Sequence, residues 1–385
     1  MKVLYSTQSV VKYDGIHYSS SPIKSMYPRY LPLGEDMVVL CYMKKVSRFR
    51  NDFLDDEVRI VTAQKVNSLK DMLLGKRKEN NTLIEQLVRD VDVCVAHVPC
   101  ELSNKVITYC KKHGKPYMTV VCGCPWDAMW NFDWRGKLLA PWAFLKLRRI
   151  QKEASFSIYV TNEFLQRRYP TNGRSIGCSN VNIPTGLDGV LEHRLENIKK
   201  HQQQGCALKI GTAAALNVTY KGQEYVIRAL SRLKCENVDF EYHLIGSGNT
   251  ERLRGIAKKE GVSDRVFFHG PLPHSKVLDF MDEMDIYVQP SKQEGLPRSA
   301  IEAMSRGCLC VGSRIAGIPE LLEPQFLFGK GNVNELAAIL KGISYDSLVD
   351  QARRNFNKAK EYDCDLLNQR RRQFIEEFKR SFANK

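Results

Sequence analysis

The feature of this sequence that most constrains its fold is a regular alternation of short strand-like runs with longer helix-like stretches. Val, Ile, Tyr and Phe are concentrated in the short runs, whereas the stretches between them repeat their apolar residues at helical spacing. The expected strands are KVLYS, DMVVLCY, VRIVTA, DVCVAHV, YMTVVCG, FSIYVT and SIGCSNVNI in the first half, and LKIGTA, FEYHLIGSG, RVFFHG, DIYVQPS, CLCVGS and QFLFG in the second. This alternation is typical of parallel sheets covered by helices, so we predict an α/β protein.

The alternation is interrupted by the polar stretch ENIKKHQQQG, residues 196–205. A chain of 385 residues is long enough for two domains. We therefore predict two Rossmann-like domains, over residues 1–200 and 201–364. Residues 365–385 combine apolar residues at helical spacing with a very basic face, which predicts an amphipathic helix that packs back on the first domain. Ligands bind at the carboxyl ends of strands in such sheets, so two domains facing each other would enclose a cleft.

The net charge narrows the class of partner. The chain carries a formal charge of +15, and the first 205 residues hold 31 Lys and Arg against 20 Asp and Glu. Such a field favours an anionic partner, which leaves nucleic acid, an acidic membrane surface and a phosphorylated substrate open. Most of the twelve cysteines lie in strand-like runs without C-x-x-C pairs, which indicates reduced core residues of a cytosolic protein. The start is typical of a strand rather than a signal peptide, and no apolar run is long enough to span a membrane.

The stretch QPSKQEGLPRSAIEAMSRGC contains the best candidate site. Glu294 lies in the loop at the carboxyl end of a predicted strand, and Glu302 lies inside the following helix. Pro297 disfavours helical geometry at Leu296, so we expect the helix to begin at about Pro297. The free amides of Gly295, Leu296 and the first helical turn then form an anion site at the positive end of the helix dipole.

A phosphate fits this anion site. The loop carboxylate would hold a hydroxyl of one group attached to the phosphate, and the helical carboxylate a vicinal diol on the other side. In the alternative interpretation, Glu294 is a loop charge and Glu302 pairs with Arg298 on a wet helix face. Such a pair contributes only a few tenths of a kcal/mol.

The surrounding string resembles a known family. The pattern PS-x2-EG-x6-EAM-x2-G-x4-GS-x2-AGIPELL, from Pro290 to Leu322, is similar to the E-x7-E donor segment of retaining nucleotide-sugar glycosyltransferases with the GT-B fold, family four. KIGTAAALNVTYKGQEYVIRAL, YHLIGSGNTERL and RVFFHGPLP precede it in the family's order. The resemblance covers the second half of the chain, and the first half matches mainly in architecture. It implies the GT-B arrangement of two Rossmann-like domains facing a cleft.

The resemblance also implies roles for single residues. Glu294 would contact the hydroxyls of the transferred sugar, Glu302 the ribose hydroxyls and Lys221 the diphosphate. The family usually has an arginine five positions before the lysine, where this chain has Leu216. Arg298 either replaces that basic contact or faces solvent. Further donor contacts are expected at Gly246, Pro271, Leu272, Gly295, Leu296 and Pro297, although Lys221 and Gly246 would also suit ordinary turns.

The acceptor side departs from the family. A paired-glycine loop usually follows the first strand, and here that loop offers only Gly15. Where the family has a histidine, YMTVVCGCPWDAMW offers Asp127, which would orient an acceptor hydroxyl or merely cap a helix. His97 also ends a predicted strand, but a core histidine is the favoured interpretation. Cys124 lacks a nearby base in the sequence, so we do not expect it to be a nucleophile.

The segment RGKLLAPWAFLKLRRIQK, residues 135–152, combines large apolar residues with six basic ones. It is typical of a helix that lies in an acidic membrane surface or approaches a lipid-linked phosphate acceptor. A covering helix with a solvated basic edge is the alternative.

We therefore predict a hexosyltransferase-type enzyme that moves a sugar from a nucleoside-diphosphate sugar to an acceptor hydroxyl with retention of configuration. The acceptor would be a saccharide or a lipid-linked saccharide in bacterial surface polysaccharide or glycolipid assembly, at the cytoplasmic side of the membrane. No cofactor or metal is expected, because DVD and DCD do not stand at the end of a strand. An oxidoreductase would need G-x-G-x-x-G after the first strand. The remaining alternative, a nucleic-acid-binding or nucleotide-binding protein without transfer, shows no recognisable motif, so no nucleic-acid partner is expected.

Overall fold

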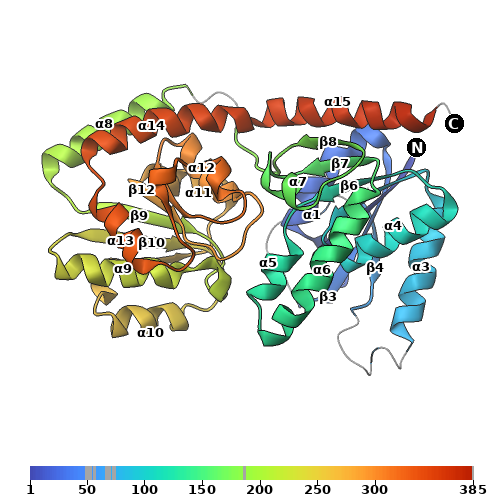
Figure 1. Cartoon of the computed structure of the whole chain (residues 1–385), viewed down its shortest axis with the longest axis horizontal. Helices are drawn as coiled ribbons and strands as arrows, with labels where there is room; N and C mark the ends of the chain where they lie inside the picture. The colour runs from blue at the N-terminus through green and yellow to red at the C-terminus, as the bar shows by residue number, and fades with distance from the viewer. Residues whose placement is uncertain (48–53, 55–57, 66–70, 72–74, 185–187, 384–385) are drawn as a thin grey trace. The chain divides into compact units, whose positions relative to one another are not determined.

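The computed structural model describes residues 1–47, 54, 58–65, 71, 75–184 and 188–383. The chain divides into two compact units, each built around one sheet (Figure 1). The first unit comprises residues 1–125, 141–180 and 368–385, and the second comprises residues 126–140 and 181–367.

The sheet of the first unit has the order β4-β3-β1-β5-β6-β7-β8, with β2 paired to β1. Only the β1–β2 pair is antiparallel among the described strands. The strands are β1 (Lys2–Tyr13), β2 (Tyr18–Ser19), β3 (Asp36–Lys45), β4 (Arg59–Ala63), β5 (Val93–Val98), β6 (Tyr117–Val121), β7 (Phe156–Tyr159) and β8 (Arg174–Gly177).

Helices cover this sheet. They are α1 (Ser21–Met26), α3 (Lys76–Asp90), α4 (Glu101–His113), α6 (Trp134–Lys152), α7 (Phe164–Arg168) and the C-terminal α15 (Cys364–Ala383). The apolar faces of α3 and α4 bury Ile84, Val88 and Val106 against β1, β3 and β5. From Asn368 onward α15 belongs to the first unit, where its Phe374 ring lies 5.3 Å from that of Phe156.

The second sheet is parallel throughout its described strands and has the order β11-β10-β9-β12-β13-β14. Figure 1 shows α9, α10 and α13 on one side of it and α8, α11, α12 and α14 on the other. The strands are β9 (Leu208–Ala213), β10 (Phe240–Ile245), β11 (Val266–Gly270), β12 (Ile286–Gln289), β13 (Leu309–Ser313) and β14 (Leu327–Phe328). The helices are α8 (Val190–Gln204), α9 (Gln223–Cys235), α10 (Glu251–Lys259), α11 (His274–Asp282), α12 (Arg298–Ser305), α13 (Val333–Lys341) and α14 (Tyr345–Ala359).

The α/β prediction is confirmed, and each run that we expected to be a strand contains one. The boundary of the second unit differs from the prediction. This unit begins at Val181 rather than at residue 201, and it also includes residues 126–140. The polar stretch 196–205 is the end of α8, which inserts Ile198 into the second core. The Arg194 guanidinium, also on α8, donates to the carbonyls of Met281 and Met284 at 2.8 and 2.6 Å, so a helix that looks polar is anchored in that core.

Candidate active site

The order of the second sheet places the predicted donor residues along one edge. Pro271 follows β11, Gly246 follows β10, Lys221 follows β9 and Glu294 follows β12, and these four strands are neighbours in the sheet. From β9 the chain proceeds to β10 and β11 on one side and then crosses to β12 on the other. In an open α/β sheet such a reversal is where ligands bind. Lys221 and Glu294 follow the two strands that flank the reversal.

Glu294 is held by three hydrogen bonds to one oxygen. Its Oε1 accepts from the Lys221 ammonium at 2.5 Å, the Ser291 hydroxyl at 2.8 Å and the Gln289 amide at 3.0 Å. The side chains of Lys221 and Glu294 are 22% and 12% exposed, so the pair is partly shielded but open to a ligand. The structure thus brings together two predicted residues that lie 73 positions apart.

A close backbone approach delivers Lys221 to this position. Lys221 ends a single 3-10 turn, Thr219–Lys221, and Gly222 follows with φ of +72°. A Cβ atom at Gly222 would lie 2.0 Å from the carbonyl oxygen of Pro290, so only glycine lets the turn pack against the loop after β12. The backbone amide of Lys292 also donates to the Tyr220 carbonyl at 2.7 Å.

The helix after the loop begins at Arg298, one residue later than expected. Pro297 is its N-cap, with φ of −72° and ψ of 111°, and no side chain caps it. The Gly295 carbonyl accepts from the Gly317 amide at 2.9 Å, and Leu296 is buried, so the backbone before the helix is fixed. The first-turn amides of α12 follow this fixed backbone, and an anion site at them stays a prediction.

The remaining donor-side residues occupy the loops nearby. Glu302 is half-buried on α12, whereas Arg298 is exposed. Gly246 has φ of +145°, and a Cβ there would lie 1.9 Å from the Ala214 carbonyl oxygen, so the loops after β10 and β9 are in contact. Leu216 is a core residue whose amide donates to the Ser247 carbonyl at 2.8 Å. Its burial gives a physical reason why this position carries no arginine.

Sequence reasoning missed the polar residues that orient Glu294. Gln289 and Ser291 are buried, and the Gln289 amide donates to the Ser291 hydroxyl at 2.8 Å as well as to Glu294. The side-chain Oε1 of Gln289 in turn accepts from the hydroxyls of Tyr287 and Ser299 at 3.0 and 3.2 Å. Burial raises the pKa of the Tyr287 hydroxyl well above its ordinary value, so this group stays a donor. The sequence signal that could have identified Gln289 and Ser291 was their position in the stretch QPSKQEGLPRSAIEAMSRGC.

Asp127 lies in the same compact unit as Glu294. It is half-buried on the short helix α5 (Pro125–Trp130), within the segment 126–140 that is grouped with the second sheet. Asn131, just after α5, donates from its amide to the carbonyls of Asp127 and Lys292 at 2.7 and 3.1 Å. It also accepts from the Lys330 ammonium at 3.3 Å. Asn131, which the sequence did not single out, therefore ties α5 to the loop that carries Glu294.

The expectation for Gly15 needs correction. We placed it in a loop after a first strand that ends near Ser6, but β1 continues to Tyr13. Ser6 is the last β1 residue paired with β5, and pairing with β3 resumes after a register shift between Ser6 and Val10. Gly15 is in the exposed turn to β2, and the eight residues from Ser6 to Tyr13 alone span roughly 20 Å. The continued pairing carries Gly15 away from the edge where β5 ends.

His97 is half-buried against aromatic neighbours, and Cys124 is buried. His97 stands edge-on to the Tyr5 ring at 4.9 Å, and its Nδ1 lies 3.6 Å from the Cys122 sulfur. Burial lowers the pKa of His97 to about 3, so the ring is neutral at physiological pH. Cys124 is buried and shares a 3.1 Å hydrogen bond with the Tyr169 hydroxyl.

The comparisons with known proteins agree with this geometry. The family model for glycosyl transferases group 1 matches residues 207–345, which contain Lys221, Glu294 and Glu302. Protein CapJ of Staphylococcus aureus is 29% identical over 337 residues, which is 86% of this chain and 83% of CapJ. The amylovoran biosynthesis glycosyltransferase AmsK of Erwinia amylovora is 32% identical over 200 residues, which is 49% of each chain. The chain is a glycosyltransferase, and its residues 207–345 match group 1.

Its fold is that of solved GT-B enzymes. The crystal structure of Anabaena Alr3699/HepE in complex with UDP superposes with a TM-score of 0.68, covers 98% of this chain and all of HepE, and is 18% identical in sequence. This likeness confirms two Rossmann-like domains. The relatives do not favour the alternative of a nucleic-acid-binding protein without transfer.

One group of potential metal ligands occurs among the described residues of the glycosyltransferase. Asp363, Cys364 and Asp365 place a ligand atom each within 4.8 Å of one another. The Asp363 carboxylate accepts from the backbone amides of Asp365 and Leu366 at 2.9 and 3.2 Å, so it caps the start of α15. That cap explains the DCD motif without a metal.

The glycosyltransferase also shows, across its described residues, no helix with the length and apolar character needed to cross a bilayer.

Proposed function

We propose that this glycosyltransferase moves a sugar from a nucleoside-diphosphate sugar to an acceptor hydroxyl, with retention of the anomeric configuration. The observation that carries the proposal is the contact between Lys221 and Glu294 beside the start of α12, at the reversal of the second sheet. A cation, a carboxylate and free helix amides stand together there. A diphosphate attached to a sugar on one side and to a ribose on the other needs those three partners.

Cationic and amide groups would bind the diphosphate, and carboxylates would bind the hydroxyls of the donor. The α12 amides and Lys221 would bind the diphosphate, and their interaction would strengthen as the bond to the anomeric carbon breaks and negative charge grows on the leaving group. Glu294, fixed by Gln289 and Ser291, would hold a sugar hydroxyl, and Glu302 would hold the ribose diol. Asp127 would orient the acceptor hydroxyl. No metal or other cofactor has a role in this proposal.

The relatives support the class of donor and the setting. HepE was crystallised with UDP, and with UDP-glucose, and AmsK is named as a glycosyltransferase of amylovoran biosynthesis. We infer that this enzyme also uses a nucleotide sugar and acts on a saccharide or lipid-linked saccharide in surface polysaccharide assembly. The cytoplasmic side of the membrane is the location that we propose for it.

We extend the proposal to contact between α6 and an acidic membrane surface. Large apolar residues on this helix point outward at helical spacing: Trp134, Leu138, Trp142 and Leu145 are 67%, 71%, 59% and 63% exposed. Between residues 134 and 152 the helix carries six basic residues and no acidic one. An apolar stripe with basic flanks is the pattern of helices that lie in the membrane interface.

Ligand-induced thermal shifts test the donor site. Nucleoside diphosphates and their sugars should raise the melting temperature of the wild-type protein, whereas Lys221→Ala and Glu302→Ala should lose most of that shift. Lys341→Ala is the matched control, because it removes an exposed lysine paired with Glu236 in the same unit. Equal ligand shifts in Lys221→Ala and the control would refute the assigned site. The anomeric configuration of the product, measured by NMR, decides retention separately, and an inverted product would overturn it.

A further inference from the structure

A second ion pair joins the two loops that carry Lys221 and Glu294. Glu224 lies in the first turn of α9, three residues after Lys221, and is 6% exposed. Its Oε1 accepts from the Lys292 ammonium at 3.1 Å, and Lys292 lies two residues before Glu294 in the loop after β12. Two pairs of opposite polarity therefore run between the same two segments: Lys221 with Glu294, and Glu224 with Lys292.

Lys292 fixes its loop through both its side chain and its backbone. The ammonium lies 5.1 Å from the centre of the Tyr225 ring, which also belongs to α9. The Lys292 amide donates to the Tyr220 carbonyl at 2.7 Å, and the Lys292 carbonyl accepts from the Asn131 side-chain amide at 3.1 Å. The loop after β12 is thus tied at this one residue to α9, to the turn before α9 and to the residue after α5.

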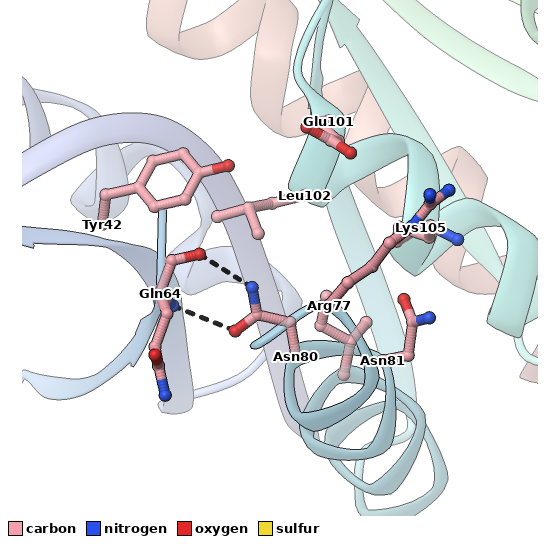
Figure 2. Close-up of a pocket in the computed structure, with 9 residues that line it drawn as sticks. Tyr42, Gln64, Arg77, Asn80, Asn81, Glu101, Leu102 and Lys105 are labelled. Carbon is pink, nitrogen blue, oxygen red and sulfur yellow. Dashed lines mark hydrogen bonds between the residues drawn. The ribbon is translucent and has the colours of Figure 1, made fainter. Parts of the chain in front are cut away.

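The first unit holds the end of a strand with neutral groups instead. Figure 2 shows the side-chain amide of Asn80 beside Gln64, with whose backbone it exchanges two hydrogen bonds of 2.9 and 2.7 Å. These bonds hold the end of β4 to α3. Because a charge costs more free energy to bury than an amide, attachment of a loop does not by itself account for a buried carboxylate at Glu224.

Donor binding changes the demands on the first pair. In the proposed function the Lys221 ammonium binds the diphosphate, so part of its attraction for Glu294 is transferred to the donor. Glu294 then keeps its two neutral hydrogen bonds, from an amide and a hydroxyl. The proposed function gives Glu224 and Lys292 no contact with the donor. Their pair therefore persists while Lys221 changes its partner.

We propose that Glu224 is a positioning residue: through Lys292 it keeps the Glu294 carboxylate directed at the transferred sugar while the donor draws the lysine of the other pair to its diphosphate. This inference rests on the proposed function and adds to it a residue that touches no substrate. Glu224 acts on the binding of the sugar and not on that of the nucleoside diphosphate, because only the sugar contacts Glu294 in the proposed function.

Arg252 decides which variants test the inference. Its Nη1 donates to the other Glu224 oxygen at 3.1 Å, and its Nε and Nη2 are closed to solvent and have no acceptor among the described residues. Glu224→Gln therefore takes a carboxylate from two cations and should also lower stability, whereas Lys292→Gln breaks the pair and leaves Arg252 its carboxylate. Lys292→Arg keeps a cation that pairs with Glu224. The matched control is Asp282→Asn, which breaks a shielded ion pair with Arg306 at the far end of α12.

Titration calorimetry on the full chain measures the affinity for two probes: the nucleotide sugar that gives the wild type its largest thermal shift, and the nucleoside diphosphate with the same base. Glu224→Gln and Lys292→Gln should each lose about tenfold in affinity for the nucleotide sugar, as expected for one charge-assisted hydrogen bond, and less than about threefold for the nucleoside diphosphate. The double variant should lose no more than about tenfold, because both changes remove the same contact. Lys292→Arg and Asp282→Asn should keep the wild-type ratio of the two affinities.

The ratio of the two affinities separates positioning from stability, which urea unfolding of the same variants measures. An unchanged ratio in Lys292→Gln would overturn the inference. A loss of the same size for both probes, or the same change of ratio in Asp282→Asn, would show that Glu224 only stabilises the fold, and would overturn it as well. A wild type that responds to no nucleotide sugar would refute the proposed function itself, and the inference with it.

Discussion

The sharpest prediction concerns Gly222, which carries no reactive group. Replacing it with alanine should weaken donor binding, because a Cβ would lie 2.0 Å from the Pro290 carbonyl oxygen. Carbon and oxygen atoms normally stay about 3.3 Å apart, so the turn has to retreat by about 1.3 Å. The movement would break the hydrogen bond between the Lys292 amide and the Tyr220 carbonyl and lengthen the 2.5 Å contact between Lys221 and Glu294.

The magnitude follows from these contacts. Alanine at a left-handed position costs about 1–2 kcal/mol of stability, and the lost backbone hydrogen bond adds about 1 kcal/mol. A charge-assisted contact of Lys221 with the diphosphate contributes about 1.5–3 kcal/mol. Its loss corresponds to a decrease in donor affinity of about tenfold to a hundredfold.

Gly261→Ala is the matched control. Gly261 has φ of +69°, close to the +72° of Gly222, but a Cβ there meets nothing within 4 Å. It should show the conformational cost alone and keep full donor affinity. Urea unfolding gives the free energy of unfolding, and titration calorimetry with a nucleoside diphosphate gives the affinity. If the two variants had the same donor affinity, the close approach at Pro290 would not be what positions Lys221.

Three further predictions follow from single features of the molecule. Burial lowers the pKa of His97 to about 3, below the ordinary 6.5, so its neutral ring contributes stability that is complete above pH 6.5 and is lost as the pH falls toward 3. The slope from this residue is at most about 1.4 kcal/mol per pH unit, and a urea series from pH 7 to 4 should flatten in His97→Gln if this account is right. Asn131→Ala should raise KM for the acceptor without lowering donor affinity, because Asn131 ties α5 to the carbonyl of Lys292, and an unchanged acceptor KM would count against a positioning role. Transfer activity should survive full chelation with EDTA, and its complete loss, restored by a divalent ion, would show that a metal is required.

Local sequence patterns determined the secondary structure of this protein well. Each β-branched run became a strand because parallel strands buried on both faces need continuous apolar sequence, as in the segment CLCVGS of β13. Pro297 marked the start of α12 to within one residue, since its ring restricts the residue before it. These rules act over a few residues, so the sequence alone suffices for them.

The tertiary structure decided which distant residues meet. Lys221 reaches Glu294 because β9 and β12 are neighbours in the sheet, and Asn131 reaches Lys292 across 161 residues. No local pattern encodes strand order, which depends on the packing of the whole unit.

The direction in which α6 faces is the clearest case. Its apolar pattern would suit burial of the large side chains, yet Ala140, Ala143 and Leu147 are buried while Trp142 and Leu138 are exposed. Amphipathicity is visible in the sequence, whereas the face that meets the core depends on how much space the neighbouring elements leave, and here the space admits mainly small residues.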